Sequence, residues 1–260
     1  MNKQLKTALC LSGHMRSYKY TWENLYHNII KPLNCDVYIS TWKTRDHTDY
    51  GYYGDRNDDN FIFLKNKKEI KRVEFEDQKE ILEQKINPLI KKNNIPLESS
   101  GAKSLSMLNM WYKIKKSFEM LEGEYDLVIR SRPDLIYGFD DNFTLSSNIT
   151  NLTFDVQKLN LPPLNGMAHN LKKYNPHKDT TIIGGTGGGS WGGGIPDIFA
   201  MSSYKNMKYY SYLYDYLIPY YKMGVKFHPE TMLKYHLERK NIELNYLDYK
   251  FGILRELNED

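Results

Sequence analysis

The sequence has only two cysteines, Cys10 and Cys35, and each lies inside an apolar run. Two cysteines are too few for a disulfide framework, and buried free thiols predict a reducing compartment. No stretch approaches the ~18 apolar residues of a membrane span, and the N-terminus lacks the segments of a signal peptide. We therefore expect a soluble cytoplasmic protein without a transmembrane segment, for which only peripheral membrane contact stays open.

The chain also lacks a large charge of one sign, because 36 basic and 32 acidic side chains leave a net charge of +4 over 260 residues. Basic and acidic residues alternate in its Lys-rich segments, whereas nucleic-acid-binding proteins usually concentrate positive charge. We expect no nucleic-acid partner, since the mild positive balance better fits an anionic small ligand. The composition is typical of a globular protein, and the length fits one domain over residues 1–260.

The glycine-rich segment at residues 184–194 lacks the context of two common nucleotide-binding motifs. It does not end in GK[ST] as a P-loop does, and it does not open a βαβ unit as a dinucleotide fingerprint does. The HExxH and paired CxxC motifs of zinc sites are also missing from the sequence. Two interpretations stay open for the segment and its Trp191: a lid or tight wall against a ligand, and a flexible surface loop.

Apolar patterning predicts an α/β fold. The apolar run at 5–12 predicts a buried strand, residues 18–33 have helical spacing, and 35–42 predict a second strand, which together form a βαβ unit. We therefore expect a mostly parallel, Rossmann-like sheet flanked by helices. The other expected elements are a short strand at 73–76, a helix at 78–94 interrupted at Pro88, a helix at 102–121, strands at 125–135 and 195–202, helices at 204–221 and 227–241, and a strand at 242–249.

Residues after the first predicted strand are candidates for ligand binding, since open α/β sheets bind ligands beyond the carboxyl ends of their strands. Ser12, Gly13 and Arg16 lie there, directly before a predicted helix. Main-chain N–H groups at a helix N-terminus suit a diphosphate, and Arg16 can neutralise its charge. In the alternative interpretation, Arg16 is a solvated residue at the start of the helix.

The segment RSRPD at 130–134 is a more specific pattern. Alternation along a strand predicts that Arg130 and Arg132 share one face of the sheet. Asp134, two residues further on, follows the same alternation. Two cations and a carboxylate at a strand end could hold a nucleotide diphosphate, with Asp134 reaching a divalent ion or a ribose hydroxyl. A structural ion pair among the three residues is the alternative.

Three later residues are candidates for acid–base chemistry. Asp197 follows the glycine-rich segment and precedes an apolar run, so it could accept a proton from a hydroxyl nucleophile. His228 and Glu230 stand at the start of a predicted helix, where they could supply a metal ligand or a base. Helix capping and complementing the helix dipole explain the same two residues equally well.

Tyrosine is unusually abundant, with 22 residues, and codon bias in an AT-rich genome explains most of this number. Tyrosines 210, 214 and 221 share a helix face and are expected in the core. Trp42 is different, because it lies after the second strand, close to tyrosines 50, 52 and 53 in a long polar loop at 43–60. We expect these aromatic residues to overhang the pocket and to stack on a base or sugar.

Four separated blocks, which leave only residues 43–100 and 139–194 outside, resemble one family of glycosyltransferases, found in capsule and lipopolysaccharide gene clusters of bacteria and in large DNA viruses. These enzymes look like nucleotide-sugar enzymes of the GT-A type, so the resemblance implies a GT-A-like single domain, cytoplasmic or in the host cytoplasm if viral. The segments are residues 8–18, 28–42, 106–120, 125–135, 197–215 and 228–242.

The resemblance implies transfer of a hexosyl or pentosyl group from a nucleotide diphosphate sugar to a hydroxyl of a glycan acceptor, on a surface polysaccharide or glycoprotein. Asp134 stands where GT-A enzymes usually carry a DxD metal motif, yet here only one carboxylate is present. Dependence on Mn or Mg therefore stays open, because the two arginines could neutralise the departing diphosphate instead. The implied roles are nucleotide-sugar binding by Ser12, Gly13, Arg16, Trp42, Arg130 and Arg132, catalysis by Asp197 and Glu230, and metal binding by Asp134 and His228.

Two other function classes stay open. A polysaccharide phosphotransferase would use the same arginines for phosphate, and a non-catalytic carbohydrate-binding protein would use the aromatic residues without the charged cluster.

Overall fold

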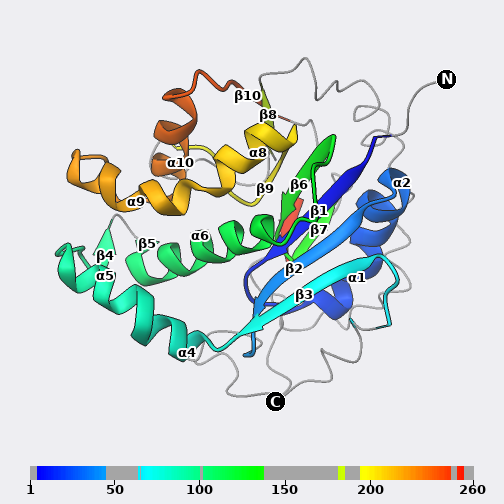
Figure 1. Cartoon of the computed structure of the whole chain (residues 1–260), viewed down its shortest axis with the longest axis horizontal. Helices are drawn as coiled ribbons and strands as arrows, with labels where there is room; N and C mark the ends of the chain where they lie inside the picture. The colour runs from blue at the N-terminus through cyan, green and yellow to red at the C-terminus, as the bar shows by residue number, and fades with distance from the viewer. Residues whose placement is uncertain are drawn as a thin grey trace.

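A seven-stranded sheet separates two layers of helices in the computed structural model of the chain, which describes residues 5–44, 64, 66–99, 102–137, 181–184, 194–246 and 251–254 (Figure 1). The strand order is β10-β8-β9-β6-β1-β2-β3. Only β9 runs against its neighbours β6 and β8, so the predicted mostly parallel α/β sheet is confirmed. The strands are β1 (Thr7–Ser12), β2 (Asp36–Trp42), β3 (Ile70–Glu76), β6 (Leu127–Ser131), β8 (Ile182–Gly184), β9 (Phe199–Ser202) and β10 (Leu244–Tyr246).

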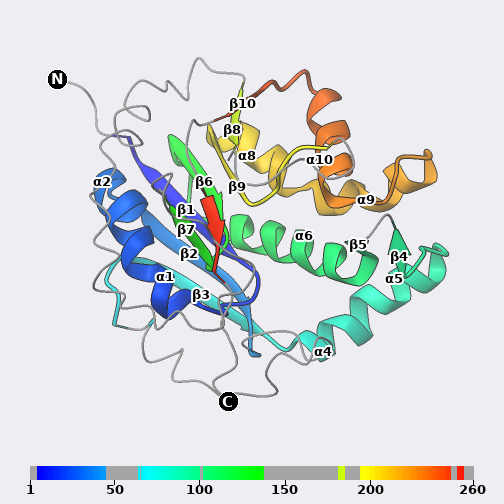
Figure 2. The same ribbon diagram turned by 180° about the vertical axis from the view of Figure 1, so that it is seen from behind.

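Each face of the sheet carries its own helices and its own apolar core (Figure 2). One layer begins with α1 and continues through a π-helical turn into α2. The second layer is larger and packs through α6 against β1 and β2. The helical segments are α1 (Tyr18–Leu25), η1 (Tyr26–Ile30), α2 (Lys31–Leu33), α4 (Gln78–Ile81), η3 (Leu82–Ile86), α5 (Asn87–Lys92), α6 (Ser104–Glu119), α8 (Tyr204–Ser211), α9 (Leu213–Lys222) and α10 (Pro229–Glu238).

The unbroken apolar run of β1 is explained by burial on both faces of the sheet. Leu9 and Leu11 belong to the core beneath α1, whereas Ala8 and Cys10 belong to the core beneath α6. Continuous apolar strands are typical of parallel sheets covered on both sides. Both cysteine thiols are free and buried, as expected.

Two expected helices have different boundaries in the structure. The helical run at 78–92 continues past Pro88, which lies just after the π-helical turn η3, where the hydrogen-bonding pattern changes. The expected helix at 204–221 is divided at Tyr212 into α8 and α9. Ser203 caps α8, since its Oγ accepts a hydrogen bond from the main-chain N–H of Asn206.

The strand expected within 125–135, with Pro133 as its stop signal, ends at Ser131, two residues before the proline. Beyond Pro133, the chain forms β7 (Leu135–Tyr137), which pairs antiparallel with β11 (Phe251–Ile253), a strand that the sequence did not predict. A further two-stranded pair joins β4 (Glu98–Ser99) to β5 (Ala102–Lys103). No helix within the described ranges is long and apolar enough to cross a membrane.

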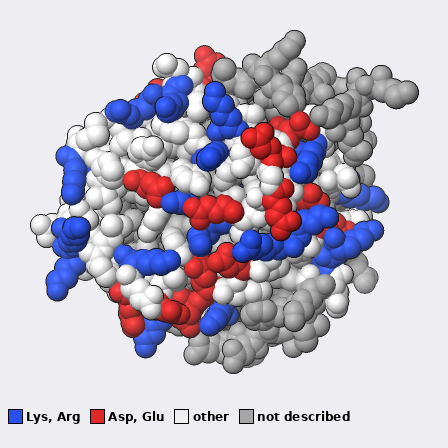
Figure 3. Space-filling model, in the orientation of Figure 1, with Lys and Arg blue, Asp and Glu red and all other residues white. Residues whose placement is uncertain are grey.

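Several expectations lie outside the described residues. They concern most of the loop at 43–60 with tyrosines 50, 52 and 53, Trp191 and most of the glycine-rich segment. On the face shown in Figure 3, basic and acidic side chains are interspersed, in agreement with the alternation in the sequence.

Candidate active site

A tight turn at the carboxyl end of β1 brings Arg16 over the edge of the sheet. The N–H of Gly13 donates to the carbonyl oxygen of Ser40 on β2, at an N···O distance of 3.1 Å. Gly13 has φ +107°, a conformation that favours glycine, and Arg16 itself has φ +42°. The turn therefore places Arg16 directly before α1, at the carboxyl edge that sequence reasoning indicated.

Arg16 and Arg132 share the carboxylate of Asp134, and we call these three residues the Asp134 cluster. Arg132 donates from Nε to Oδ1 and from Nη2 to Oδ2, both at 2.8 Å. Arg16 Nη1 donates to Oδ2 at 3.0 Å. Burial alone would raise the pKa of Asp134, but the two guanidinium groups outweigh it and hold the pKa well below its usual range. Asp134 is therefore ionised, and two cations share one anion.

The loop that carries Asp134 is anchored by the C-terminal strand pair and by α1. The N–H of Leu254 donates to the carbonyl oxygen of Asp134 at 2.8 Å. Ser17 Oγ donates to the carbonyl oxygen of Leu254, and Thr21 Oγ1 donates to that of Pro133. Sequence reasoning missed these contacts because residues around 254 resembled a charged tail without structure.

Arg130 does not join the Asp134 cluster, so the expectation that Arg130, Arg132 and Asp134 share one face is wrong. The strand ends at Ser131, and alternation no longer applies to the residues beyond it. Arg130 is 1% exposed and donates from Nη1 to the main-chain carbonyl of Asp197. The structural ion pair considered as an alternative is present, but it joins Arg132 and Arg16 to Asp134.

A second group of polar residues surrounds Asp197, and we call Arg130, Asp197, Tyr210 and His228 the Asp197 cluster. Burial and the charge of Lys226 lower the pKa of His228, while nearby Asp197 opposes the shift. His228 is 7% exposed, and its Nδ1 has no hydrogen-bond partner among the described residues. The same holds for Arg130 Nε and Tyr210 OH within the described ranges. Buried polar atoms of this kind are typical of a site that receives a ligand or water.

Close packing between residues 194–195 and the first turn of α10 fixes the position of this second group. The N–H of Ile195 donates to the carbonyl oxygen of Glu230 at 3.1 Å. A Cβ atom on Gly194 would lie 2.2 Å from the main-chain carbon of Glu230, so only glycine fits there. The main chain of Glu230 therefore contacts residues 194–195, which lead to Asp197.

Two buried hydroxyl groups lie side by side near the turn after β1. Ser12 is paired in register with Ser40 of β2, and both are at most 4% exposed. Neither Oγ has a hydrogen-bond partner in the part of the chain that the structure describes. Ser12 and Gly13 therefore line the carboxyl edge of the sheet.

Trp42 is buried at the end of β2, with only 3% of its surface exposed. Lys113 Nζ lies 4.0 Å from the centre of its ring, and Tyr112 stacks against it at 6.2 Å. In this conformation the ring packs in the core and does not offer a face for stacking on a ligand.

Lys113 is a functional candidate that sequence reasoning missed. It is fully buried and donates to the carbonyl oxygen of Thr41 and to Glu76 Oε2, both at 2.7 Å. Burial lowers its pKa to about 8, although Glu76 opposes the shift. Asn109, Lys113 and Ser117 form a buried polar stripe along α6 at intervals of four residues, a spacing that could have indicated the site.

The described residues do not fit a Mn or Mg site at Asp134. Both carboxylate oxygens already bind guanidinium groups, whereas these cations prefer carboxylate oxygens that are open to them. Within the described ranges, no three His, Cys, Asp or Glu residues gather as metal ligands. We therefore assign no chemical step to a metal.

No protein-family model matches the chain, and no curated protein sequence matches it. Among solved structures, the chain is similar to the apo form of mouse xyloside xylosyltransferase 1, with a TM-score of 0.44 and 9% sequence identity. The superposition covers 94% of this chain and 85% of the mouse chain. Similarity at this level does not transfer residue roles from one chain to the other.

Proposed function

We propose that the protein transfers a sugar from a nucleotide diphosphate sugar to a hydroxyl group of a glycan acceptor. The Asp134 cluster carries this proposal, because it holds two arginines and one carboxylate at the carboxyl edge of a mostly parallel sheet. Its formal charge is 2 − 1 = +1, which favours an anionic ligand. The resemblance of the separated segments to GT-A-type glycosyltransferases supports the same reaction.

In the proposed reaction, the bond between the anomeric carbon and the diphosphate oxygen breaks, and negative charge develops on the leaving diphosphate. The positive charges of Arg16 and Arg132 stabilise this developing negative charge. Asp134 keeps the two guanidinium groups in place and is a positioning residue. The turn at Ser12 and Gly13 supplies the floor on which the diphosphate rests.

Asp197 is the proposed base. The acceptor oxygen forms a bond to the anomeric carbon, and its proton passes to the Asp197 carboxylate. Arg130 holds the main chain of Asp197, and a lowered pKa keeps His228 neutral at pH 7, so that His228 can donate a hydrogen bond without adding charge. Glu230 has its main chain against residue 195 and is the second candidate for the base.

The first test is a thermal-shift panel of UDP, GDP, CDP and CMP sugars, each with and without Mn. A nucleotide that binds the folded state raises the melting temperature by mass action. We expect at least one nucleotide diphosphate sugar to do so without Mn. The proposal is wrong if no nucleotide shifts the melting temperature and no sugar is transferred in any of these conditions.

The second test replaces Asp197 by Asn. We expect transfer to fall by about 10²–10⁴-fold, the contribution typical of general base catalysis, while the nucleotide still shifts the melting temperature. Asp215→Asn is the matched control, because Asp215 lies on the exposed surface of α9 in an ion pair with Lys115. Unchanged turnover in the Asp197 variant would remove this residue from the role of base. An acceptor product that carries phosphate in place of a new sugar would instead support a phosphotransferase.

A further inference from the structure

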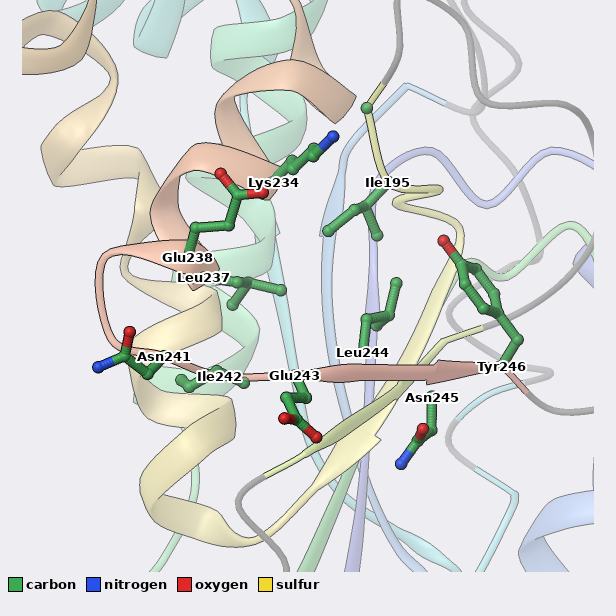
Figure 4. Close-up of a pocket in the computed structure, with 11 residues that line it drawn as sticks. Ile195, Lys234, Leu237, Glu238, Asn241, Ile242, Glu243, Leu244, Asn245 and Tyr246 are labelled. Atoms are coloured by element: carbon green, nitrogen blue, oxygen red, sulfur yellow. The ribbon is translucent and has the colours of Figure 1, made fainter.

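A groove beside the candidate active site has the dimensions of a ligand-binding site. It lies between α10, β10 and residues 194–195, and its volume is about 760 Å³ (Figure 4). Sites for small molecules typically have volumes of about 300–1,000 Å³. The residues that line it are Gly194, Ile195, Lys234, Leu237, Glu238, Asn241, Ile242, Glu243, Leu244, Asn245 and Tyr246.

The lining combines an apolar floor with hydrogen-bonding groups and an aromatic ring. Figure 4 shows the side chains of Leu244 and Tyr246 on the side of β10 that faces Ile195, with Leu237 opposite them on α10. Tyr246 is 53% exposed, so its ring is open to a ligand. A sugar presents apolar C–H faces, which pack on such a ring, and hydroxyl groups, which pair with amide, carboxylate and ammonium groups.

The groove and the Asp197 cluster share one wall. Gly194 and Ile195 line the groove, and Asp197 follows only two residues later, a distance of about 7 Å in an extended chain. The hydrogen bond from Ile195 to Glu230 and the close packing at Gly194 fix this wall against α10. The segment 194–197 therefore leads from the groove to the Asp197 cluster.

We propose that this groove binds the acceptor as a neutral oligosaccharide, with its terminal sugar directed toward Asp197. The inference rests on the proposed function and specifies the acceptor. The groove is lined by one lysine and two glutamates, so its formal charge is 1 − 2 = −1. This charge disfavours a polymer rich in phosphate or uronic acid, whereas a neutral glycan carries no such penalty.

The test attaches a bulky group to the groove. Tyr246→Cys is labelled with maleimide-linked polyethylene glycol, and Tyr20→Cys, on the exposed face of α1 in the other helical layer, is the matched control. Selective labelling is feasible because Cys10 and Cys35 are buried and burial raises the pKa of both thiols. The probes are a panel of neutral p-nitrophenyl glycosides and oligosaccharides as acceptors, together with hydrolysis of the donor in their absence.

We expect labelled Tyr246→Cys to lose transfer by at least tenfold, while donor hydrolysis stays within twofold of wild type. Labelled Tyr20→Cys keeps both activities. Unlabelled Tyr246→Ala raises the acceptor KM by up to about tenfold through the lost aromatic contact, with kcat nearly unchanged.

Equal transfer by labelled and unlabelled Tyr246→Cys, with donor hydrolysis intact, would overturn the groove assignment and leave the proposed function standing. A preference for phosphorylated or uronic-acid acceptors over the neutral panel would overturn the neutral-glycan assignment. If wild type neither hydrolyses nor transfers any donor sugar, the proposed function fails, and the inference fails with it.

Discussion

Replacing Asp134 by Asn would leave Arg16 and Arg132 without the anion that they share, in a site where the carboxylate is almost fully buried. Removing one partner of a buried ion pair typically costs about 3–5 kcal/mol. The side chain of Arg132 is 19% exposed and partly solvated, so we take the lower end, about 3 kcal/mol. For a chain of this size, that loss corresponds to a melting temperature lower by roughly 6–12 °C.

The pH dependence gives an independent check on the cause. Because the pKa of Asp134 in the folded state lies below its unfolded value of about 3.9, its contribution is fully present above that pH and is lost as the pH falls further. The difference in unfolding free energy between wild type and Asp134→Asn should therefore be constant from about pH 5 to 8 and shrink below about pH 4.

Urea denaturation across this pH range measures the difference. Asp215→Asn again serves as the control, since it removes an exposed ion pair worth only about 0.2–1 kcal/mol. Our account of the Asp134 cluster is refuted if Asp134→Asn unfolds within about 0.5 kcal/mol of wild type at pH 7, because surface substitutions commonly have effects of that size.

Two further predictions concern Gly194 and Lys113. Gly194→Ala should destabilise the fold by about 1–3 kcal/mol, since its Cβ would overlap the main chain of Glu230, and chemical denaturation measures the loss; wild-type stability would contradict the close packing. The unfolding free energy of wild type should rise between about pH 8 and 10.5 relative to that of Lys113→Met, since the lowered pKa of Lys113 means that the unfolded state binds more protons there. Parallel pH profiles of the two proteins would show that Lys113 titrates normally.

The first strands and helix of the sheet were predictable from local patterns, whereas β8 was not. Apolar runs, helical spacing and their alternation indicated β1, α1 and β2 with boundaries close to those observed, because strands buried on both faces leave an unambiguous apolar signal. The rule that ligands bind at the carboxyl ends of strands also directed attention to Arg16 and Asp134, which the structure brings together.

Other features depend on contacts that no local pattern encodes. Arg130 and Arg132 separate because β6 ends between them and the chain continues into β7, which pairs with the distant β11. The burial of Trp42 depends on Lys113, a residue 71 positions later whose charge suggests a surface location. Tertiary packing, which sequence spacing does not report, decides both outcomes.

The bond from Leu254 to Asp134 has a consequence for biosynthesis. During translation the Asp134 loop emerges long before residue 254, so a nascent chain must carry both arginines and their carboxylate without this anchor. Contacts of such long sequence separation also slow folding, because a large loop has to close before they form. Completion of the site is therefore a late event in the maturation of the chain.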